Sequence, residues 1–364
     1  MKCREFAERE GLIRVDIANR EVLEKRRLKG LHKYVNLYIS PRNAMMYILK
    51  KSNVVILGIS GEVVKREGVR VSIGNAASEY AVIRNFADVY IDRLIREVRK
   101  IRDWTLGEIQ QIDVKSFLKR EPINLFINPK VLLQSEILIP RIVGKKYIRA
   151  IYVPDDDTKG IVREIIDKAG VRIDIIVQPN MFFLPQRKVK IYKNIWVVKG
   201  DLFDSEMQTL TISVNTVGVM GKGLASRLKY LYPSAYVAYQ DYVKSGVLKP
   251  GRPVVYRMIG DNDYIKWFLF FPTKRHWREK SEISMIEEGL RWFVKNYKKE
   301  GIESVAFPAL GCGLGGLKWE DVGPLMVKYL KYVDIEVELY VQGDEEEYFK
   351  PEFYGLHADG DIEG

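Results

Sequence analysis

The chain has few of the residues that build disulfides and metal sites, since its 364 residues include only two cysteines and three histidines. The cysteines, Cys3 and Cys312, stand far apart, and no CxxC pair or Cys/His cluster accompanies them. This scarcity excludes a disulfide framework, and no metal is expected. It is typical of a reducing compartment, so a cytoplasmic location is expected.

Long apolar runs are also missing. The uninterrupted apolar runs have the length of a strand, such as residues 54–57, whereas a membrane helix needs about 20 apolar residues. No basic segment followed by an apolar one opens the sequence, so we expect neither a secretion signal nor a membrane partner. With 47% hydrophobic residues, the chain is long enough for two domains that each bury a core.

Positive charge is concentrated in the first half of the chain, whose overall net charge is +11. Residues 1–180 carry 34 Lys and Arg against 23 Asp and Glu, whereas residues 181–364 carry 25 of each kind. A basic domain beside a neutral one predicts that the first half contacts a polyanion such as nucleic acid. The alternative is a basic surface that only keeps the chain soluble.

The hydrophobic pattern divides the chain into a domain over residues 1–183, a linker over 184–188, a second domain over 189–345 and a polar, loosely held tail over 346–364. The second domain alternates strand and helix patterns, which predicts an α/β layered fold. Its expected strands are 190–199, 210–214, 264–271 and 304–310. Its expected helices are 222–232, 284–297 with a capping box of Ser284 and Glu287, and one from residue 319.

The first domain has a mixed α+β pattern. Strands are expected at 34–39, 53–59, 135–139, 148–153 and 172–183, and helices at 87–104 and 159–169. The 87–104 helix carries Arg93, Arg96 and Lys100 on the side away from its apolar face. These three residues are candidate DNA contacts, although a charged helix face is usually only solvated.

Two glycine-rich loops follow predicted strands of the second domain. The first, residues 217–223 (VGVMGKG), opens a helix, and the second is 311–316 (GCGLGG). Glycine lets backbone N–H groups approach phosphate oxygens, and a helix start adds partial positive charge. Together with Asp201 after the first strand and Asn215 before the first loop, the two loops predict a clamp for a diphosphate.

These motifs, with residues 200–203 (GDLF) and 214–216 (VNT), resemble a macrodomain over about 155 residues. The resemblance implies a three-layer α/β/α fold with a mixed sheet that binds ADP-ribose, with Asp201 receiving the adenine amino group. The implied ADP-ribose ligands are Asp201, Leu202, Asn215, Gly218, Met220, Gly221, Lys222, Gly223, Gly311, Cys312, Gly313 and Leu314.

The segment 271–277 (FPTKRHW) resembles the DarG branch of macrodomains, in which the lysine of the Thr-Lys pair is essential; here that lysine is Lys274. A neutral lysine beside bound ribose attacks the anomeric carbon and forms a sugar–lysine adduct, which water releases. The adjacent Arg275 favours the neutral amine. Asn215 is the candidate for a second catalytic group. His276 and Cys312 are more simply explained as packing or surface residues.

The segment 31–47 (LHKYVNLYISPRNAMMY) resembles the DarT family, as do 74–78 (GNAAS) and 134–139 (QSEILI). DarT toxins transfer ADP-ribose from NAD to thymidine in single-stranded DNA, so the resemblance implies an ADP-ribosyltransferase-like fold with NAD as substrate. Glu136 is then the catalytic carboxylate, which stabilises an oxocarbenium-like ribosyl cation. Arg42 suits catalysis and bidentate NAD binding. The remaining candidate NAD contacts are His32, Asn43 and Tyr47.

One departure from the DarT pattern bears on activity. DarT proteins usually begin with a strand whose histidine contacts NAD, whereas this sequence reaches Glu10, Gly11 and Leu12 almost at once. Either the true start lies upstream or the transferase half binds NAD poorly, and this puts transferase activity, though not ancestry, in doubt.

The sequence predicts a fused toxin–antitoxin protein in which the first half writes ADP-ribose on thymidine-containing single-stranded DNA and the second half erases it, with contact between the halves. One alternative is an ADP-ribose-binding or -hydrolysing macrodomain joined to a weakened, nucleic-acid-binding transferase remnant. Another is a hydrolase that acts on protein or RNA ends.

Overall fold

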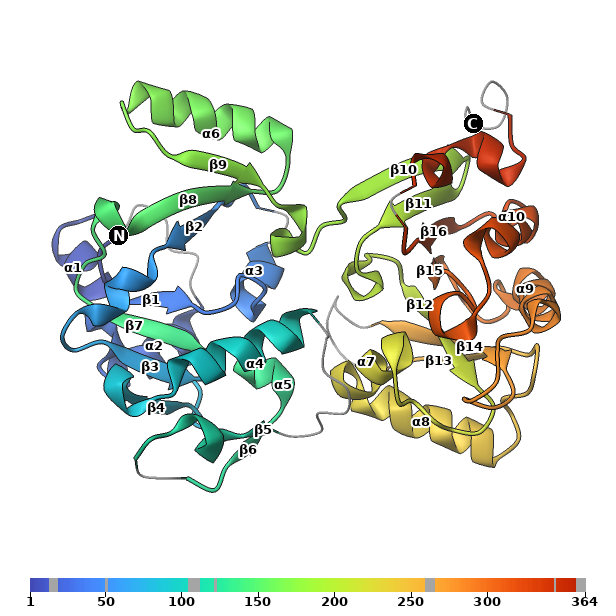
Figure 1. Ribbon diagram of the computed structural model, residues 1–364, viewed down its shortest axis with the longest axis horizontal. Helices are drawn as coiled ribbons and strands as arrows, with labels where there is room; N and C mark the ends of the chain where they lie inside the picture. Colours follow the sequence, from blue (N-terminus) through green and yellow to red (C-terminus); the bar gives the residue numbers. More distant parts are fainter. Residues whose placement is uncertain are drawn as a thin grey trace. The chain divides into compact units, whose positions relative to one another are not determined.

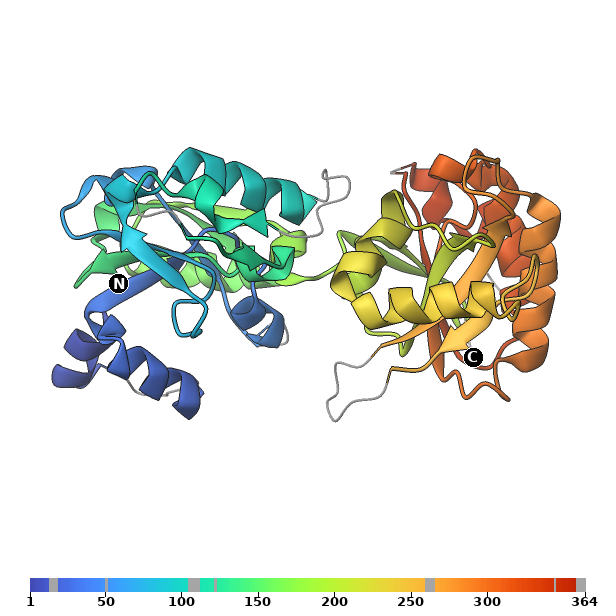
Figure 2. The same ribbon diagram turned by 90° about the horizontal axis from the view of Figure 1, so that it is seen from below.

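The computed structural model describes residues 1–12, 19–49, 52–103, 112–120, 123–258, 266–343 and 345–357. The chain forms two compact units, Met1–Phe183 and Leu184–Gly364, which are described separately. Figures 1 and 2 show both units from perpendicular directions. Within the described residues, no helix combines the length and the apolar character needed to cross a bilayer.

The first unit is built on a four-stranded antiparallel sheet in the order β1-β7-β3-β4 (Figure 1). These strands are β1 (Tyr34–Tyr38), β7 (Glu136–Pro140), β3 (Arg70–Ile73) and β4 (Val82–Asn85). Helix α4 (Ile91–Asp103) shares a buried core with Val71 and Ile73. Because side chains alternate along a strand, Ser72 and its partner Glu136 lie on the opposite face, toward α2 (Arg20–Leu28).

A three-stranded sheet in the order β2-β8-β9 forms the other part of the first unit. Its strands are β2 (Ile56–Ile59), β8 (Ile148–Val153) and β9 (Asp174–Val177). Helix α6 (Asp156–Lys168) connects the parallel strands β8 and β9, and Asp155 caps its start by accepting a hydrogen bond from the Thr158 N–H. The smaller elements are α1 (Arg4–Arg9), α3 (Ala44–Leu49), α5 (Pro129–Leu132), β5 (Ile112–Asp113) and β6 (Phe126–Ile127).

The second unit contains a seven-stranded mixed sheet in the order β10-β11-β16-β15-β12-β14-β13. The strands are β10 (Arg187–Tyr192), β11 (Ile195–Lys199), β12 (Thr209–Asn215), β13 (Val254–Tyr256), β14 (Trp267–Lys274), β15 (Ser304–Pro308) and β16 (Glu336–Tyr340). The five central strands of this order, β11, β16, β15, β12 and β14, pair in parallel. The edge strands β10 and β13 pair antiparallel with their neighbours β11 and β14.

Helices cover both faces of this sheet. One core joins α9 (Ile283–Asn296) and α10 (Trp319–Leu330) to the sheet, and another joins α7 (Gly223–Leu231) and α8 (Pro233–Lys244) to it. The central strands β12 and β14 are buried along most of their length, as expected for parallel strands with both faces covered. The expected three-layer α/β/α fold with a mixed sheet is confirmed.

The prediction of a loosely held polar tail is wrong for residues 346–356. Two short 3₁₀ helices, η9 (Glu346–Phe349) and η10 (Pro351–Tyr354), bury Tyr348, Phe349 and Tyr354 in the core that contains α10. Acidic residues interleave these aromatics in the sequence, which hid the apolar contacts. Residues 358–364 of the expected tail lie outside the described residues.

Several expected boundaries also shift. The helix expected over 87–104 begins at Ile91, because residues 86–88 form a 3₁₀ turn. The Ser284–Glu287 capping box is wrong, since Ser284 lies inside α9 and Glu282 occupies the N-cap without a side-chain cap. Strand β10 begins at Arg187, within the segment expected to be a linker, and the 190–199 run is divided between β10 and β11.

Candidate functional site

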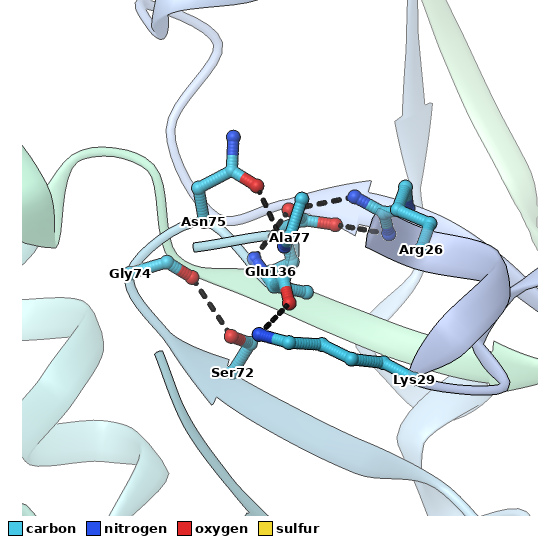
Figure 3. A network of polar contacts seen from close by, with 8 residues as sticks. Arg26, Lys29, Ser72, Gly74, Asn75, Ala77 and Glu136 are labelled. Carbon is cyan, nitrogen blue, oxygen red and sulfur yellow. Dashed lines mark hydrogen bonds and ion pairs between the residues drawn. The ribbon is translucent and has the colours of Figure 1, made fainter. Parts of the chain in front are cut away.

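Glu136 begins β7 and its carboxylate is completely buried. Arg26 of α2 donates two hydrogen bonds to it, from Nη1 to Oε1 at 3.3 Å and from Nη2 to Oε2 at 3.0 Å. The Ala76 N–H donates to Oε1 at 3.1 Å. A buried carboxylate is tolerated when a cation and further donors satisfy it, and Arg26 and Ala76 supply both. Figure 3 shows the Arg26 side chain facing Glu136.

The turn that carries Ala76 is fixed from two sides. The Gly74 N–H donates to Ser135 Oγ at 3.0 Å, and Lys29 Nζ of the segment after α2 donates to the Ala76 carbonyl at 3.2 Å. Gly74 has φ +86°, and an added Cβ would lie 3.0 Å from the Val131 side chain, so glycine is required there. The turn therefore aims the Ala76 N–H at the carboxylate.

Tyr38 is the cross-strand neighbour of Glu136 on β1. Burial raises the pKa of the Tyr38 phenol to about 12; the Glu136 charge adds to this rise and Arg26 opposes it. The phenol therefore stays protonated at neutral pH, next to the buried carboxylate.

Arg42 lies in the loop that follows β1, and its guanidinium lies 4.3 Å from the centre of the Phe183 ring. It also donates to the Asn180 carbonyl at 2.9 Å. Tyr47 of α3 meets the same Phe183 ring edge to face, with ring centres 5.1 Å apart. Two of the sequence-predicted NAD contacts, Arg42 and Tyr47, are thus brought together on one aromatic ring.

Asn43 and His32 hold elements in place in this structure. Asn43 is buried; its Nδ2 donates to the Ser40 carbonyl at 3.0 Å, and its Oδ1 accepts from the Met46 N–H at 3.0 Å, at the start of α3. His32 Nε2 lies 3.1 Å from the Leu23 carbonyl of α2. These contacts connect Asn43 to the helix of Tyr47, and His32 to the helix of Arg26.

The three candidate DNA contacts have different surroundings. Arg93 and Arg96 line a cavity of about 470 Å³ together with Tyr90 and Lys119. Lys100, by contrast, is paired with Glu97 at 2.9 Å. Arg93 and Arg96 are therefore the better placed of the three to bind an external anion.

A second cavity, of about 270 Å³, is lined by Arg70, Arg84 and Arg120, with Asp88 as its acidic residue. Val89, which lines the first cavity, forms a β-bridge with Leu118, and the consecutive residues Lys119 and Arg120 line different cavities. We call the two cavities together the basic groove. The sequence pattern did not predict the three arginines of the second cavity, because they come from three separate segments.

In the second unit, Asn215 organises the first glycine loop. It is buried, and its Nδ2 donates to the Val219 carbonyl at 2.6 Å. Its Oδ1 accepts from the Val217 N–H at 3.1 Å and from the Tyr239 hydroxyl at 3.1 Å. Both polar ends of the amide are thus engaged in holding the loop, which favours a positioning role over the catalytic one expected from the sequence.

The second glycine loop packs tightly against the start of α9. Gly311 has φ +71°, and a Cβ there would lie 2.9 Å from the Ile286 side chain. A Cβ on Gly315 would lie 2.4 Å from Ser281 Oγ. The backbone N–H of Ser281 donates to the Gly315 carbonyl at 2.8 Å. Larger residues are therefore excluded at both positions.

Lys274 ends β14 and is the register partner of Asn215 on β12. Its Nζ donates to the Leu314 carbonyl of the second glycine loop at 3.3 Å and to the Glu279 carbonyl at 3.2 Å. Leu314 in turn lies close to Gly223 of the first loop. Lys274 is thus placed beside the two loops that the sequence predicts to hold ADP-ribose. Arg275, expected to favour the neutral lysine, lies 3.5 Å from Glu282, so its charge is partly compensated.

The expected adenine contact, Asp201, follows β11. Its Oδ1 accepts from the Phe203 N–H at 3.1 Å, and its Oδ2 pairs with Arg227 of α7 at 2.5 Å. The Arg227 guanidinium lies 4.8 Å from the centre of the Phe203 ring. Leu202 is buried beside them. A base that binds Asp201 therefore meets an arginine at the same carboxylate.

The Cys312 thiol has a pKa raised to about 11, first by burial and then by the charges of Glu320 and Asp321. It stays protonated at neutral pH, which disfavours a nucleophilic role. The other loop residues implied as ADP-ribose ligands are Gly218, Met220, Gly221, Lys222 and Gly313, all within or directly beside the two loops. Within the described part of the chain, no group of three or more His, Cys, Asp or Glu side chains is placed to hold a metal.

Three residues at these sites were missed from the sequence: Arg26, Tyr38 and Phe183. Arg26 stands in a basic run with Lys25 and Arg27, and only burial distinguishes it from them. For Tyr38 the signal was present, since it belongs to a predicted strand that could pair with that of Glu136. Phe183 carried no signal, because its contact with Arg42 joins residues 141 positions apart.

Comparisons with known proteins agree with the families predicted for both halves of the chain. The family model described as "ssDNA thymidine ADP-ribosyltransferase, DarT" matches residues 1–183, and the macro domain model matches residues 213–326. A "DNA ADP-ribosyl transferase-DNA ADP-ribosyl glycohydrolase fusion protein" of Thermosipho africanus is 40% identical over 332 residues, or 86% of this chain and 80% of that protein. A "DNA ADP-ribosyl glycohydrolase" of Mycobacterium tuberculosis is 39% identical over 142 residues, or 39% of this chain and 40% of that protein.

The solved structure of Thermosipho africanus DarTG in complex with ADP-ribose has a TM-score of 0.82 at 37% identity and covers 97% of this chain and 94% of that one. The resemblance of the first half to DarT and of the second half to a DarG-type macrodomain is confirmed. The chain therefore belongs to the family in which a DarT ADP-ribosyltransferase and a DarG-type macrodomain are fused in one polypeptide.

Proposed function

We propose that this protein is a fused toxin and antitoxin, in which the first unit transfers ADP-ribose from NAD to thymidine bases of single-stranded DNA and the second unit removes it. The observation that carries the proposal is the position of Lys274, whose amine touches the second glycine loop in a chain whose first unit belongs to the DarT family. A writer and an eraser in one chain act on the same base, and fusion keeps the antidote at high effective concentration.

In the transfer step the bond between nicotinamide and ribose breaks, and nicotinamide leaves with the electron pair. Glu136 stabilises the cationic ribose, and the thymine ring nitrogen attacks the anomeric carbon while its proton passes to the Glu136 carboxylate. Arg42 and Tyr47, which meet on Phe183, provide a cation and an aromatic surface for the diphosphate and a ring of NAD. Because Glu136 is fully enclosed, substrate contact requires that Arg26 releases one carboxylate oxygen.

In the removal step the Lys274 amine attacks the anomeric carbon of the ADP-ribose, and the bond to thymine breaks with return of a proton to the base. Water then adds to the sugar–lysine adduct, releases ADP-ribose and restores the amine. The two glycine loops hold the diphosphate through their backbone N–H groups, and Asp201 receives the adenine amino group. Asn215 keeps the first loop in shape.

The test compares the purified chain with its Lys274→Ala variant in the presence of NAD and a thymidine-containing single strand. Modified DNA that accumulates only in the variant supports writing and erasing in one molecule. If neither form hydrolyses DNA that already carries ADP-ribose on thymidine, the erasing activity is refuted. An oligonucleotide without thymidine is the control for the base, and a double-stranded one for the strandedness.

A second candidate is a macrodomain hydrolase joined to a transferase unit that has lost activity. The complete enclosure of Glu136 by Arg26 and the Ala76 turn favours it. In that case neither form of the protein modifies DNA, whereas the wild type alone hydrolyses DNA that was modified beforehand.

We also propose that single-stranded DNA binds along the basic groove. Arg93 and Arg96 line one of its cavities, and Arg70 and Arg120 line the other. Tyr90, which is half exposed and lines the first cavity with Lys119 Nζ 5.6 Å from its ring centre, offers a stacking surface for a base. Cations that track a backbone, with an aromatic between them, are the usual means of binding single strands.

A further inference from the structure

Trp277 is a large, exposed side chain three residues after Lys274, in the loop that follows β14. Solvent reaches 46% of its surface. A single exposed hydrophobic residue is common, so its position beside Lys274 is more informative than its exposure.

The backbone around Trp277 forms a closed turn over residues 276–279. The Glu279 N–H donates to the His276 carbonyl at 3.1 Å, and the His276 N–H donates to Glu279 Oε2 at 3.1 Å. The carbonyl of the same Glu279 accepts the hydrogen bond from Lys274 Nζ. The turn thus contacts the reactive lysine at one point and holds Trp277 in a preset position, which lowers the entropic cost of binding.

One cation and one imidazole ring lie against the indole. The Arg278 guanidinium lies 4.5 Å from the centre of the Trp277 ring, and the His276 ring centre lies 5.4 Å from it. The Lys280 side chain lies along Gly316 of the second glycine loop. In the described part of the chain, neither Arg278 nor Lys280 forms an ion pair with an acidic residue, whereas Arg275 is paired with Glu282.

The Lys274 amine contacts both the second glycine loop, at the Leu314 carbonyl, and the 276–279 turn, at the Glu279 carbonyl. In the proposed function the glycine loops take the ADP-ribose, so the turn is the part of this contact that is left for the group from which ADP-ribose is cleaved. Trp277, Arg278 and Lys280 are therefore placed to meet the carrier of the modification.

We propose that Trp277, Arg278 and Lys280 form a nucleic-acid platform, on which Trp277 stacks a base of the ADP-ribosylated single strand and the two cations contact neighbouring phosphates. Aromatic faces with adjacent unpaired cations are the elements that bind single strands, since every base has a π face and every linkage a negative charge. The inference rests on the proposed function of the second unit. It gives that unit a physical preference for DNA over protein as the carrier.

The test measures binding in the full chain with Lys274→Ala, which stops turnover. One ligand is free ADP-ribose, and the other is a single-stranded oligonucleotide that carries ADP-ribose on one thymidine. We expect tighter binding of the oligonucleotide than of ADP-ribose, and a reduction of that advantage by roughly tenfold or more when Trp277→Ala is added. Binding of ADP-ribose alone shows that the variant is folded.

Replacement of both cations, Arg278→Gln with Lys280→Gln, is expected to weaken oligonucleotide binding and to flatten its dependence on salt. The logarithmic slope should fall by about 0.7 for each phosphate that is no longer neutralised. The matched control is Tyr332→Ala. Tyr332 is also exposed on the second unit, with Lys331 lying 5.4 Å from its ring centre, but on a different segment.

The proposal is overturned if Trp277→Ala binds the modified oligonucleotide as well as its parent, if Tyr332→Ala weakens binding as much, or if the weakening is equal for free ADP-ribose. It is also overturned if an ADP-ribosylated peptide depends on Trp277 to the same degree. Failure of the proposed function is seen separately, as an inability of the wild-type chain to hydrolyse the modified oligonucleotide while the Lys274→Ala form still binds it.

Discussion

The guanidinium of Arg26 faces the buried carboxylate of Glu136 through two hydrogen bonds of 3.0 and 3.3 Å. The pair joins α2 to the first strand position of β7, across 110 residues of sequence. It has two consequences that can be separated by experiment. It stabilises a charge that could not otherwise be buried, and it occupies the oxygens that the transfer reaction needs.

The first prediction concerns stability. Arg26→Gln leaves the Glu136 carboxylate buried without its cation, and removal of one partner of a buried pair costs about 3–5 kcal/mol. We therefore expect a large fall in the free energy of unfolding of the first unit, measured from its unfolding transition in urea. Arg27→Gln is the matched control, since Arg27 is the next residue, is exposed and pairs with the nearby Glu24; its stability should equal that of the wild type.

The double variant Arg26→Met with Glu136→Gln tests whether the cost comes from the unpaired charge. Removal of both charges should restore much of the stability that Arg26→Gln removes, although transferase activity stays absent because the carboxylate is gone. If the double variant is as unstable as the single one, the Arg26 side chain matters through packing rather than through charge.

The second prediction concerns the basic groove. Arg93→Gln with Arg96→Gln should weaken binding of an unmodified single strand and reduce its salt dependence, by about 0.7 in logarithmic slope for each phosphate that is no longer neutralised. Lys100→Gln should change binding much less, because Lys100 is already paired with Glu97. Fluorescence anisotropy over a salt series measures both. An equal effect of Lys100→Gln would instead assign binding to the whole helix face.

Much of the second site could be predicted because its residues stand in short runs of sequence that can be recognised on their own. Gly311 and Gly315 belong to the glycine-rich run 311–316, although the side chains that exclude a Cβ there include those of Ser281 and Ile286. Lys274 stands in a short motif that ends a buried strand.

What could not be predicted depends on contacts between distant segments. Nothing local shows which of the basic residues around Arg26 turns inward, since its partner Glu136 lies far along the chain. The same holds for Tyr348 and Tyr354, which look like part of an acidic tail until the core that contains α10 covers them. The misplaced start of α4 has another cause, since the 3₁₀ turn at Phe86–Asp88 continues the same apolar pattern.

The third prediction uses the raised pKa of Cys312, about 11 against an ordinary thiol value near 9. Between these pH values the unfolded chain releases the thiol proton while the folded chain retains it. Stability should therefore fall as pH rises from about 9 toward 11, by at most about 1.4 kcal/mol per pH unit, and the contribution of Cys312 should fade within about one pH unit below 9.

Urea unfolding of the wild type and of Cys312→Ser over that pH range isolates this contribution, because tyrosine and lysine titrate in both proteins. A smaller slope in the variant confirms the raised pKa. Alkylation followed by peptide mass mapping gives a second readout, in which Cys312 should react slowly at pH 7–8. Rapid alkylation of the folded protein at pH 7 would contradict the prediction.

The fourth prediction separates the roles of Asn215 and Lys274. Both were candidate catalytic groups, but the Asn215 amide is occupied by the Val219 carbonyl and the Tyr239 hydroxyl, whereas the Lys274 amine touches two backbone carbonyls beside the loops. Asn215→Ala should loosen the first glycine loop and weaken ADP-ribose binding, so that the KM for modified DNA rises more than kcat falls. Calorimetry with ADP-ribose and steady-state hydrolysis measure the two quantities.

Lys274→Ala should show the opposite behaviour, with ADP-ribose binding largely retained and hydrolysis abolished, because the variant lacks the attacking amine but keeps both loops. Lys274→Arg is the matched control for charge, since a guanidinium retains the cation and is too weak a nucleophile to replace the amine. Borohydride added during turnover should trap the wild-type protein as a sugar–lysine adduct at Lys274, detectable by mass spectrometry. Full activity of Lys274→Arg would remove the covalent step from the mechanism and leave Lys274 as an electrostatic contact.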